Sequence, residues 1–466
     1  MKQDLRCTYY KVKKDNHFLS ILVIFIIFIS VVRMDVLAES PMLRVGIFLD
    51  HREVELRSEK GLHIYEIPSM KSLYVHKNSN PLKITANYNG IEINNQLYNP
   101  VKEIKIIPNN GGLIQVNNHK YRGEIEIVSE KKLLNVINII EMEKYLYGVL
   151  KKEISPEWPE EVLRAQAVAA RTFALSNMNK FIDKGYNICA TTNSQAYGGV
   201  YHEHPATNKA VNDTNGIILT FQGEPINAVY HSDSGGCTEN SEDVWGGFIP
   251  YLRSVPSDYE EIVSPPNHQW SCSFTEQEVL EKLAQQGYHF SVIDSIVFGD
   301  KTEAGRVKSV DIIGDNNKII NMKTNDFRLL MGPTIIRSSL FTIDIIGNRT
   351  EEISKVSETL NIPEQKTQLE QKKVGDIIRE ERDFSISELI ELLKRPKGET
   401  IVKKVNFSDV EEDSHTDELL FTFKGLGSGH GVGLSQWGAY GMASEGYSYE
   451  DILKYYYQGI QLKKLY

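Results

Sequence analysis

Glu153 is a lone glutamate whose carboxyl group could take part in proton transfer, and a surface or helix-capping carboxylate is the alternative. It lies between a strand-like segment with a glycine turn at Gly148 and a helix expected to begin at Trp158-Pro159. In a bend before a helix, a carboxyl group can be held at the edge of a cleft and act as a general acid and then as a general base. Glycosidases of the usual kind need a second carboxylate. None is evident close by, because the next glutamates belong to the first turn of the expected helix or directly precede it.

The expected helix has a well-marked start. Pro159 takes the first helical position, where its missing N–H costs nothing, and acidic residues follow in the first turn. Residues 162–175 are rich in alanine, leucine, glutamine and arginine, which are strong helix formers. Gln166 and Arg171 interrupt this surface and are candidates for lining a binding groove. Trp158 could roof the preceding carboxyl group and raise its pKa by desolvation.

Three glycine-containing segments, 189–200, 225–236 and 425–438, bring further polar side chains toward a ligand. The candidates for substrate binding in them are Gln195, Tyr197, His231, Ser234, His430 and Gln436. Glycine bends let the backbone approach a ligand, while tyrosine, histidine and glutamine supply stacking and hydrogen-bonding groups. Plain turns packed on the core explain the same glycines, so both interpretations stay open.

The composition narrows the class of partner. The 466-residue chain has a net charge of −10 and a pI near 5.7, and no basic domain stands out, which argues against nucleic acid. These values fit an exported protein that works among glycans of neutral or mixed charge. The 23 tyrosines offer flat amphipathic surfaces on which sugars can stack, although core and strand tyrosines account for most of them.

The pattern along the chain indicates its domains and an α+β fold class. Residues 1–38 join a basic segment to a short apolar run, as an export signal or a membrane anchor does, which places the rest outside the cytoplasm. Residues 43–140 alternate short β segments with turns, and residues 141–345 mix helices with strands. Residues 346–418 are charged and polar and predict a flexible insertion, and residues 419–466 complete the domain that starts at 141. Expected elements within that domain include a helix at 275–286 and strands at 291–298 and 307–313.

Three blocks of the sequence resemble the SpoIID/LytB family of cell-wall proteins. The first is EKYLYGVLKKEISPEWPEEVLRAQAVAARTFAL, residues 143–175, which holds the family's GV-x-x-x-E element and its A-Q-A-V-A-A-R-T helix. The second, within residues 192–245, contains NSQAYGGVY and YHSDSGGCTENSEDVW. The third is GLGSGHGVGLSQWGAYGMASEGYSYEDILKYYYQGI, residues 425–460. The resemblance covers residues 43–345 and 419–466.

The resemblance implies a lytic transglycosylase that cuts peptidoglycan glycan strands, with Glu153 as catalytic acid and base. One carboxyl group suffices, because it protonates the leaving glycosidic oxygen and then takes the proton of the C6 hydroxyl of the same muramic residue, giving an anhydro end. No cofactor is required. SpoIID-like relatives act in engulfment during sporulation beside a cell-wall amidase and a membrane partner. LytB-like members are described as enhancers of separate amidases, so a non-catalytic, wall-binding enhancer is the alternative.

The cysteines bear on a metal site. With Cys7 set aside in the amino-terminal segment, Cys189, Cys237 and Cys272 remain, an odd number that excludes a complete disulfide framework. In the resemblance, His231 and Cys237 match positions that bind zinc in some SpoIID-like proteins, and either remaining cysteine could complete the site. Such a zinc would be structural. A free buried cysteine beside a hydrogen-bonded histidine is one alternative, and a zinc hydrolase at these residues is another.

Overall fold

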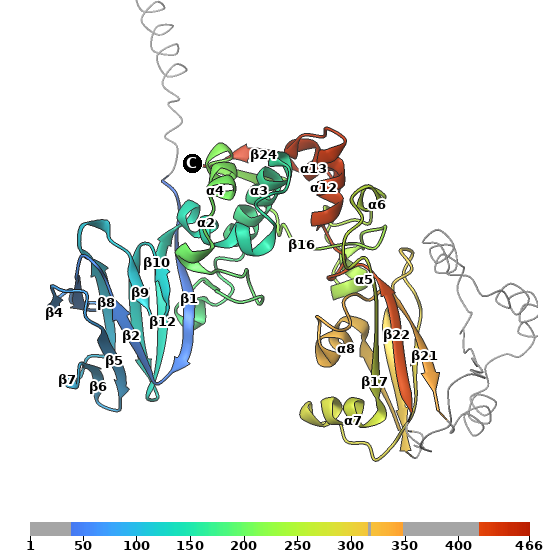
Figure 1. Cartoon of the computed structure of the whole chain (residues 1–466), viewed down its shortest axis with the longest axis horizontal. Coiled ribbons are helices and arrows are strands. Elements are labelled where there is room, and N and C mark those ends of the chain that lie inside the picture. The colour runs from blue at the N-terminus through green and yellow to red at the C-terminus, as the bar shows by residue number, and fades with distance from the viewer. Residues whose placement is uncertain (1–38, 316–317, 348–418) are drawn as a thin grey trace, which may run out of the picture.

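The computed structural model describes residues 39–315, 318–347 and 419–466 (Figure 1). Helices and sheets are both present, which confirms the predicted α+β class. The predicted export signal or anchor at 1–38 and nearly all of the predicted insertion, residues 348–418, lie outside the described residues. Within the described ranges, no helix combines the length and the apolar character needed to cross a bilayer.

The amino-terminal part consists of two packed β-sheets, as the alternating pattern of residues 43–140 predicts. The first sheet has the order β13 (Ile188–Cys189), β1 (Met42–His51), β12 (Leu133–Glu141), β11 (Glu124–Glu130), β8 (Glu103–Pro108), β3 (Leu62–Glu66) and β4 (Ser72–His76). The second has the order β10 (His119–Tyr121), β9 (Ile114–Val116), β2 (Glu53–Arg57), β5 (Leu82–Asn87), β6 (Gly90–Ile93) and β7 (Gln96–Tyr98). Aliphatic side chains from both sheets, such as Ile84 and Ile127, are fully buried in one shared core.

Helix α2 (Met142–Glu153) follows β12 directly, so the predicted strand and glycine turn before Glu153 are wrong. Gly148 lies inside this helix. A Cβ at this position would stand 2.6 Å from the ring of Tyr197 and 3.0 Å from the carbonyl oxygen of Gly199. The glycine therefore serves close packing of the helix against a loop, and it makes no turn. Glu153 is the last residue of the helix.

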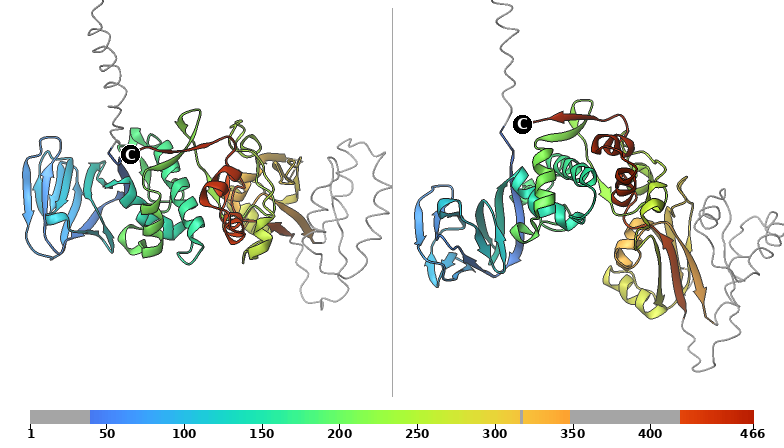
Figure 2. Two further views of the ribbon diagram at one scale, coloured as in Figure 1. Left: turned by 90° about the horizontal axis from the view of Figure 1, so that it is seen from above. Right: turned by 45° about the horizontal axis from the view of Figure 1, so that its top comes forward.

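A second core contains the long predicted helix, α3 (Glu160–Ser176), which Pro159 caps. The other helices of this part are α4 (Pro205–Asp213), α5 (Ser241–Trp245), α6 (Tyr259–Val263), α12 (Gln436–Ser444) and α13 (Tyr449–Tyr456). Its strands are β14 (Ile217–Phe221), β15 (Glu224–Pro225), β16 (Tyr230–His231), β23 (Leu434–Ser435) and β24 (Gln461–Lys464). The carboxyl-terminal segment thus returns across the helical part, where β24 pairs with β14 (Figures 1 and 2).

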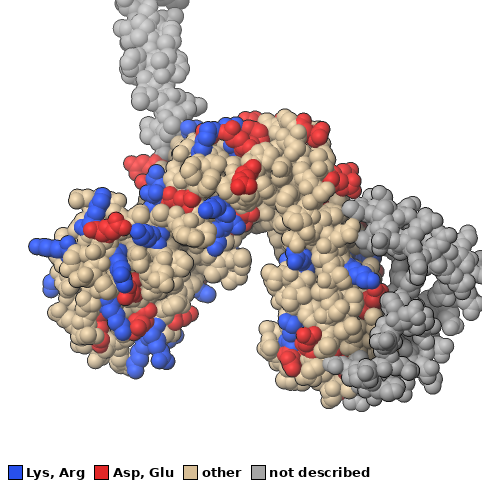
Figure 3. All heavy atoms as spheres, viewed as in Figure 1, with Lys and Arg blue, Asp and Glu red and all other residues tan. Residues whose placement is uncertain are grey.

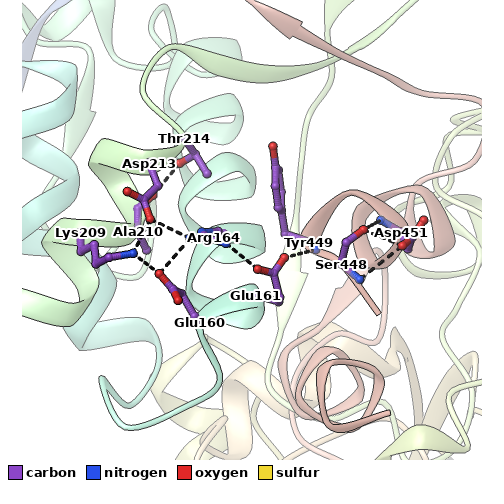
Figure 4. A network of polar contacts seen from close by, with 10 residues as sticks. All are labelled: Glu160, Glu161, Arg164, Lys209, Ala210, Asp213, Thr214, Ser448, Tyr449 and Asp451. Atoms are coloured by element: carbon purple, nitrogen blue, oxygen red, sulfur yellow. Dashed lines mark hydrogen bonds and ion pairs between the residues drawn. The ribbon is translucent and has the colours of Figure 1, made fainter. Parts of the chain in front are cut away.

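Arg164 connects the start of α3 to the neighbouring helix α4 (Figure 4). Its guanidinium lies 2.6 Å from the carboxylate of Glu161 and 2.9 Å from that of Asp213. Glu161 in turn accepts a 2.7 Å hydrogen bond from the backbone N–H of Tyr449, at the start of α13. Charged groups of α3 therefore tie together helices that are far apart in the sequence.

The third core joins two three-stranded sheets to two helices. One sheet has the order β17 (Gln269–Thr275), β22 (Leu420–Leu426), β21 (Phe341–Ile346), and the other has the order β18 (Ile293–Phe298), β19 (Ser309–Gly314), β20 (Lys318–Lys323). The helices are α7 (Glu276–Gln285) and α8 (Thr324–Met331). The carboxyl-terminal block supplies the central strand β22. A hollow separates this part from the β-sheets of the amino-terminal part, with the helices above it (Figure 3).

Replacing Thr275 by alanine should lower the free energy of unfolding by about 1 kcal/mol, because the residue caps α7. The Thr275 hydroxyl accepts from the N–H of Glu278, and the Glu278 carboxylate accepts from the N–H of Thr275. Urea denaturation would measure the change. Thr275→Ser keeps the hydroxyl and should remain close to the unsubstituted protein; an equal loss in both variants would contradict the capping role.

Candidate active site

The carboxyl group of Glu153 is partly buried and held by two donors from other segments. The backbone N–H of Ala196 and the hydroxyl of Tyr230, on β16, both donate hydrogen bonds to it. Burial raises the pKa of Glu153 above its ordinary value, while these two hydrogen bonds and the ammonium group of Lys152 act in the opposite direction. The predicted rise of the Glu153 pKa is therefore present.

Trp158, which the sequence predicted to cover the Glu153 carboxyl group, packs against two aromatic rings. Its ring centroid lies 4.7 Å from that of Trp437 and 5.2 Å from that of Tyr440, both on α12. The groups that bond Glu153 come instead from the loop before Tyr197 and from β16. The sequence predicted the direction in which desolvation shifts the pKa of Glu153, but it did not predict which residues form hydrogen bonds with Glu153.

Gln195 lies directly behind Tyr230. Its Nε2 group donates to the Tyr230 hydroxyl at 3.0 Å and to the carbonyl oxygen of Ala170 at 3.2 Å. Its Oε1 atom accepts from the hydroxyl of Tyr145, on α2, at 3.2 Å. Of the predicted substrate-binding residues, Gln195 thus joins the Glu153 site through Tyr230, which the sequence analysis left unassigned. The sequence did offer a signal for Tyr230, because this residue immediately precedes His231 in the second motif block.

Tyr197 supports this site from the core. Its side chain is 5% exposed, and its hydroxyl donates to the Asn138 side chain at 2.9 Å. Its ring packs on that of Tyr145 with a centroid distance of 4.9 Å. The prediction that Tyr197 lines a substrate groove is corrected, because its polar atom already has a buried partner.

Arg171 does not line a groove either. It is fully buried, and its Nε and Nη2 atoms lie 2.8 and 2.7 Å from the carboxylate oxygens of Glu143. Further bonds go to the carbonyl oxygens of Val211 and Ile217. The sequence-based prediction failed because a polar residue on an alanine-rich helix can face a buried partner as well as a ligand.

Gln166 and Gln436 lie together, although they are 270 positions apart in the sequence. The Nε2 atom of Gln436 lies 3.4 Å from the Oε1 atom of Gln166, which is 1% exposed. The Nε2 atom of Gln166 is buried without a hydrogen-bond partner among the described residues. The contact joins α3 to α12.

His231 and His430 also form a pair, with ring centroids 5.5 Å apart. Burial lowers the pKa of His430 to about 4 and that of His231 well below its usual range, so both imidazoles are neutral at pH 7. The ring of Trp245, which is 40% exposed, packs on His430 at 5.2 Å. His430 also forms a hydrogen bond with the backbone of Tyr230, so this aromatic cluster adjoins the residue that donates to Glu153.

Ser234 is fully buried and is not positioned for substrate. Its hydroxyl donates to Glu260 at 2.6 Å, and its backbone N–H donates to the same carboxylate at 2.7 Å. Ser435 also donates to Glu260. The prediction that Ser234 binds substrate is therefore corrected, because the glycine turn at this residue surrounds the buried carboxylate of Glu260.

The zinc site at His231 and Cys237 stays a prediction, since among the described residues neither belongs to a group of three candidate metal ligands. The Nδ1 atom of His231 lies 3.1 Å from the carbonyl oxygen of Val432, and Cys237 Sγ lies 3.2 Å from the hydroxyl of Ser254. None of the three cysteines in the described ranges is in a disulfide. The group of three candidate ligands that does converge there consists of Asp233, Glu260 and His268.

That converging group is an internal hydrogen-bonded cluster. Asp233 accepts from His268 Nδ1 at 2.9 Å and from the N–H of Gly235 at 2.8 Å. The oxygens of Glu260 accept from the backbone N–H groups of Ser234 and Gly236. Because these donors already occupy the carboxylates, the donor set does not fit a bound cation.

Fold and site together define an α+β protein in which one partly buried glutamate is held by a backbone amide and a tyrosine. Residues 130–221, which include this glutamate, match the model of the SpoIID family, described as stage II sporulation protein. The resemblance to the SpoIID family, predicted from the motif blocks, is confirmed by this match and by the similarity to named relatives.

The relatives with functional names fall into two groups. Stage II sporulation protein D of Bacillus subtilis is 28% identical over 340 residues, 70% of this chain and 75% of that protein. The amidase enhancer of the same organism is 28% identical over 319 residues, 68% of this chain but 40% of that protein. An uncharacterised protein of Brachyspira hyodysenteriae is 28% identical over 348 residues, 74% of this chain and 73% of that protein.

Proposed function

We propose that this protein is a lytic transglycosylase that acts on the glycan strands of peptidoglycan in sporulation or cell-wall remodelling. The neutral carboxyl group of Glu153 gives its proton to the glycosidic oxygen, and the bond from C1 to that oxygen breaks with its electron pair on the leaving group. The C6 hydroxyl of the same muramic residue then attacks C1 and passes its proton to the Glu153 carboxylate. The product is an anhydro end, no water is consumed, and Glu153 is regenerated.

The observation that carries this proposal is the environment of Glu153. Burial favours its neutral form, which a general acid needs, while Tyr230 and Ala196 stabilise the carboxylate that forms after proton transfer. Among the described residues, the charged group that acts on the Glu153 carboxyl is Lys152, and none of the partners of Glu153 is a second carboxylate. An arrangement of this kind suits a reaction that needs one carboxyl group.

The products formed from purified glycan strands test the proposal. The full-length chain should release fragments with anhydro-muramic ends, which mass spectrometry separates from the reducing ends left by hydrolysis. Strands with and without stem peptides should be compared, because the amidase and membrane partners implied by the family would act around the same substrate. Reducing ends would contradict the transglycosylase assignment and require a second carboxylate.

The second candidate is a wall-binding enhancer of a separate amidase, which the relative named amidase enhancer favours. In that case the chain binds cell walls, and a cell-wall amidase works faster in its presence. The enhancement should be unchanged by Glu153→Gln. An enhancement that disappears in this variant would instead tie the effect to the carboxyl group.

A further inference from the structure

The amide group of Gln195 can be oriented without ambiguity from its partners. The carbonyl oxygen of Ala170 can only accept a hydrogen bond, so the atom 3.2 Å from it must be the Nε2 donor. The Oε1 atom then faces Tyr145, whose hydroxyl supplies the proton. The second hydrogen of Nε2 is therefore directed at the hydroxyl oxygen of Tyr230, 3.0 Å away.

This orientation decides which way the Tyr230 hydroxyl donates. Because its oxygen accepts from Gln195, its own hydrogen is left for its other partner, the carboxyl group of Glu153. Burial raises the pKa of Tyr230 well above its ordinary value, so the hydroxyl keeps its proton in any working range of pH. The Tyr230 hydroxyl is therefore always a hydrogen-bond donor, and its hydrogen is directed at the carboxyl group of Glu153.

We propose that Tyr230 is a positioning residue for Glu153, and that Gln195 and Tyr145 hold its hydroxyl in the single orientation that donates to the carboxyl group. This inference rests on the proposed function of Glu153 and deepens it. The proton that Glu153 transfers must then occupy a lone pair that neither Tyr230 nor Ala196 takes. The carboxylate formed when the leaving group is protonated meets a donor already in place, so no reorganisation is needed at that step.

Substituting Tyr230 by phenylalanine tests this role. Loss of a hydrogen bond to a charged group should raise the pKa of Glu153 by about one pH unit. The acid form then persists to higher pH, so the alkaline limb of the profile of kcat/KM against pH should move up by the same amount. The maximal kcat should fall roughly tenfold with KM little changed, since a carboxyl group of higher pKa is a weaker acid toward the glycosidic oxygen in the first half of the reaction.

The pKa of Glu153 can also be read without substrate. Isotope-edited infrared spectra of the full-length chain with labelled glutamate, minus those of Glu153→Gln, isolate the carboxyl band of this residue. The groups whose charge acts on or feels this carboxyl are Lys152, Tyr145 and Tyr230. Burial raises the pKa of both tyrosines well above the ordinary value, so neither hydroxyl titrates around neutral pH. The band should therefore titrate as a single group, at higher pH in Tyr230→Phe.

Tyr147→Phe is the matched control. Tyr147 lies on the same helix as Glu153, but its hydroxyl donates to Asn212 at 2.6 Å. It should leave the titration of Glu153 in place, whereas Gln195→Met should shift it in the direction of Tyr230→Phe. An unshifted titration in Tyr230→Phe, or an equal shift in Tyr147→Phe, would overturn the proposal. If the titration shifts but the unsubstituted chain makes no anhydro ends, the positioning stands and the transglycosylase assignment falls.

Discussion

Glu153→Gln should abolish the release of anhydro-muramic ends from glycan strands, with a loss in kcat/KM of roughly 10²–10⁴-fold. Glutamine keeps the size of the side chain and can still accept from Ala196 and Tyr230, but it has no proton to give to the glycosidic oxygen. The second half of the reaction also fails, because an amide is a poor acceptor for the proton of the C6 hydroxyl. Binding of intact strands should persist, which co-sedimentation with purified wall would measure.

The stability of this variant separates loss of chemistry from loss of fold. The folded state raises the pKa of Glu153. The group therefore favours folding only while it is neutral, and this contribution is lost as the pH rises through the folded pKa. At pH 7, removing the ionisable group should leave the melting temperature unchanged or slightly higher. A marked fall in melting temperature would mean that the inactivity is due to misfolding.

Glu157→Gln is the matched control, since this exposed glutamate lies four residues beyond the candidate acid. It should retain full activity on glycan strands. Equal activity in Glu153→Gln and the unsubstituted chain would remove the acid–base assignment, and the enhancer function would then account for the shared family motifs. Equal loss in both glutamine variants would point to a general electrostatic effect of the acidic segment.

Local patterns predicted the elements that depend on local physics. Pro159 with the acidic first turn of α3, the alternation of the amino-terminal strands and the pattern of the helix predicted at 275–286 each favour one structure within a few positions of the chain. Helix α2 was missed because Gly148 is a poor helix former in isolation. Its role becomes visible only when the ring of Tyr197 lies against it.

The site was predictable where the family motif marks it, and not where distant segments meet. Glu153 stands out in the sequence, yet its hydrogen-bond partners come from positions 196 and 230. In β16 successive side chains point to opposite faces, so Tyr230 reaches Glu153 while His231 packs on His430. His231 was chosen as a candidate functional residue because histidines often have such roles, whereas the neighbouring Tyr230 was not chosen. Burial, which the sequence does not reveal, decided which polar residues serve the fold.

Arg171→Met should destabilise the protein by about 3–5 kcal/mol, because it leaves the buried carboxylate of Glu143 without its cation. Glu143 is 5% exposed, and its remaining donors are the hydroxyl of Tyr466 at 2.6 Å and the N–H of Gly216 at 3.3 Å. Neutral donors of this kind offset only part of the cost of burying a charge. Urea denaturation followed by far-UV circular dichroism would measure the loss.

Arg164→Met provides the comparison, because its guanidinium is 25% exposed and water can replace it; about 1 kcal/mol or less is expected there. Pairing Arg171→Met with Glu143→Leu should restore much of the stability, since no unpaired charge is left in the core. If Arg171 instead bound the glycan, Arg171→Met would raise KM at temperatures where the chain is still folded, and the second substitution would not restore it. We therefore expect the double variant to have a KM close to that of the unsubstituted chain. This result would show that Arg171 holds α2 against α3, and that this contact keeps Glu153 in place at the end of α2.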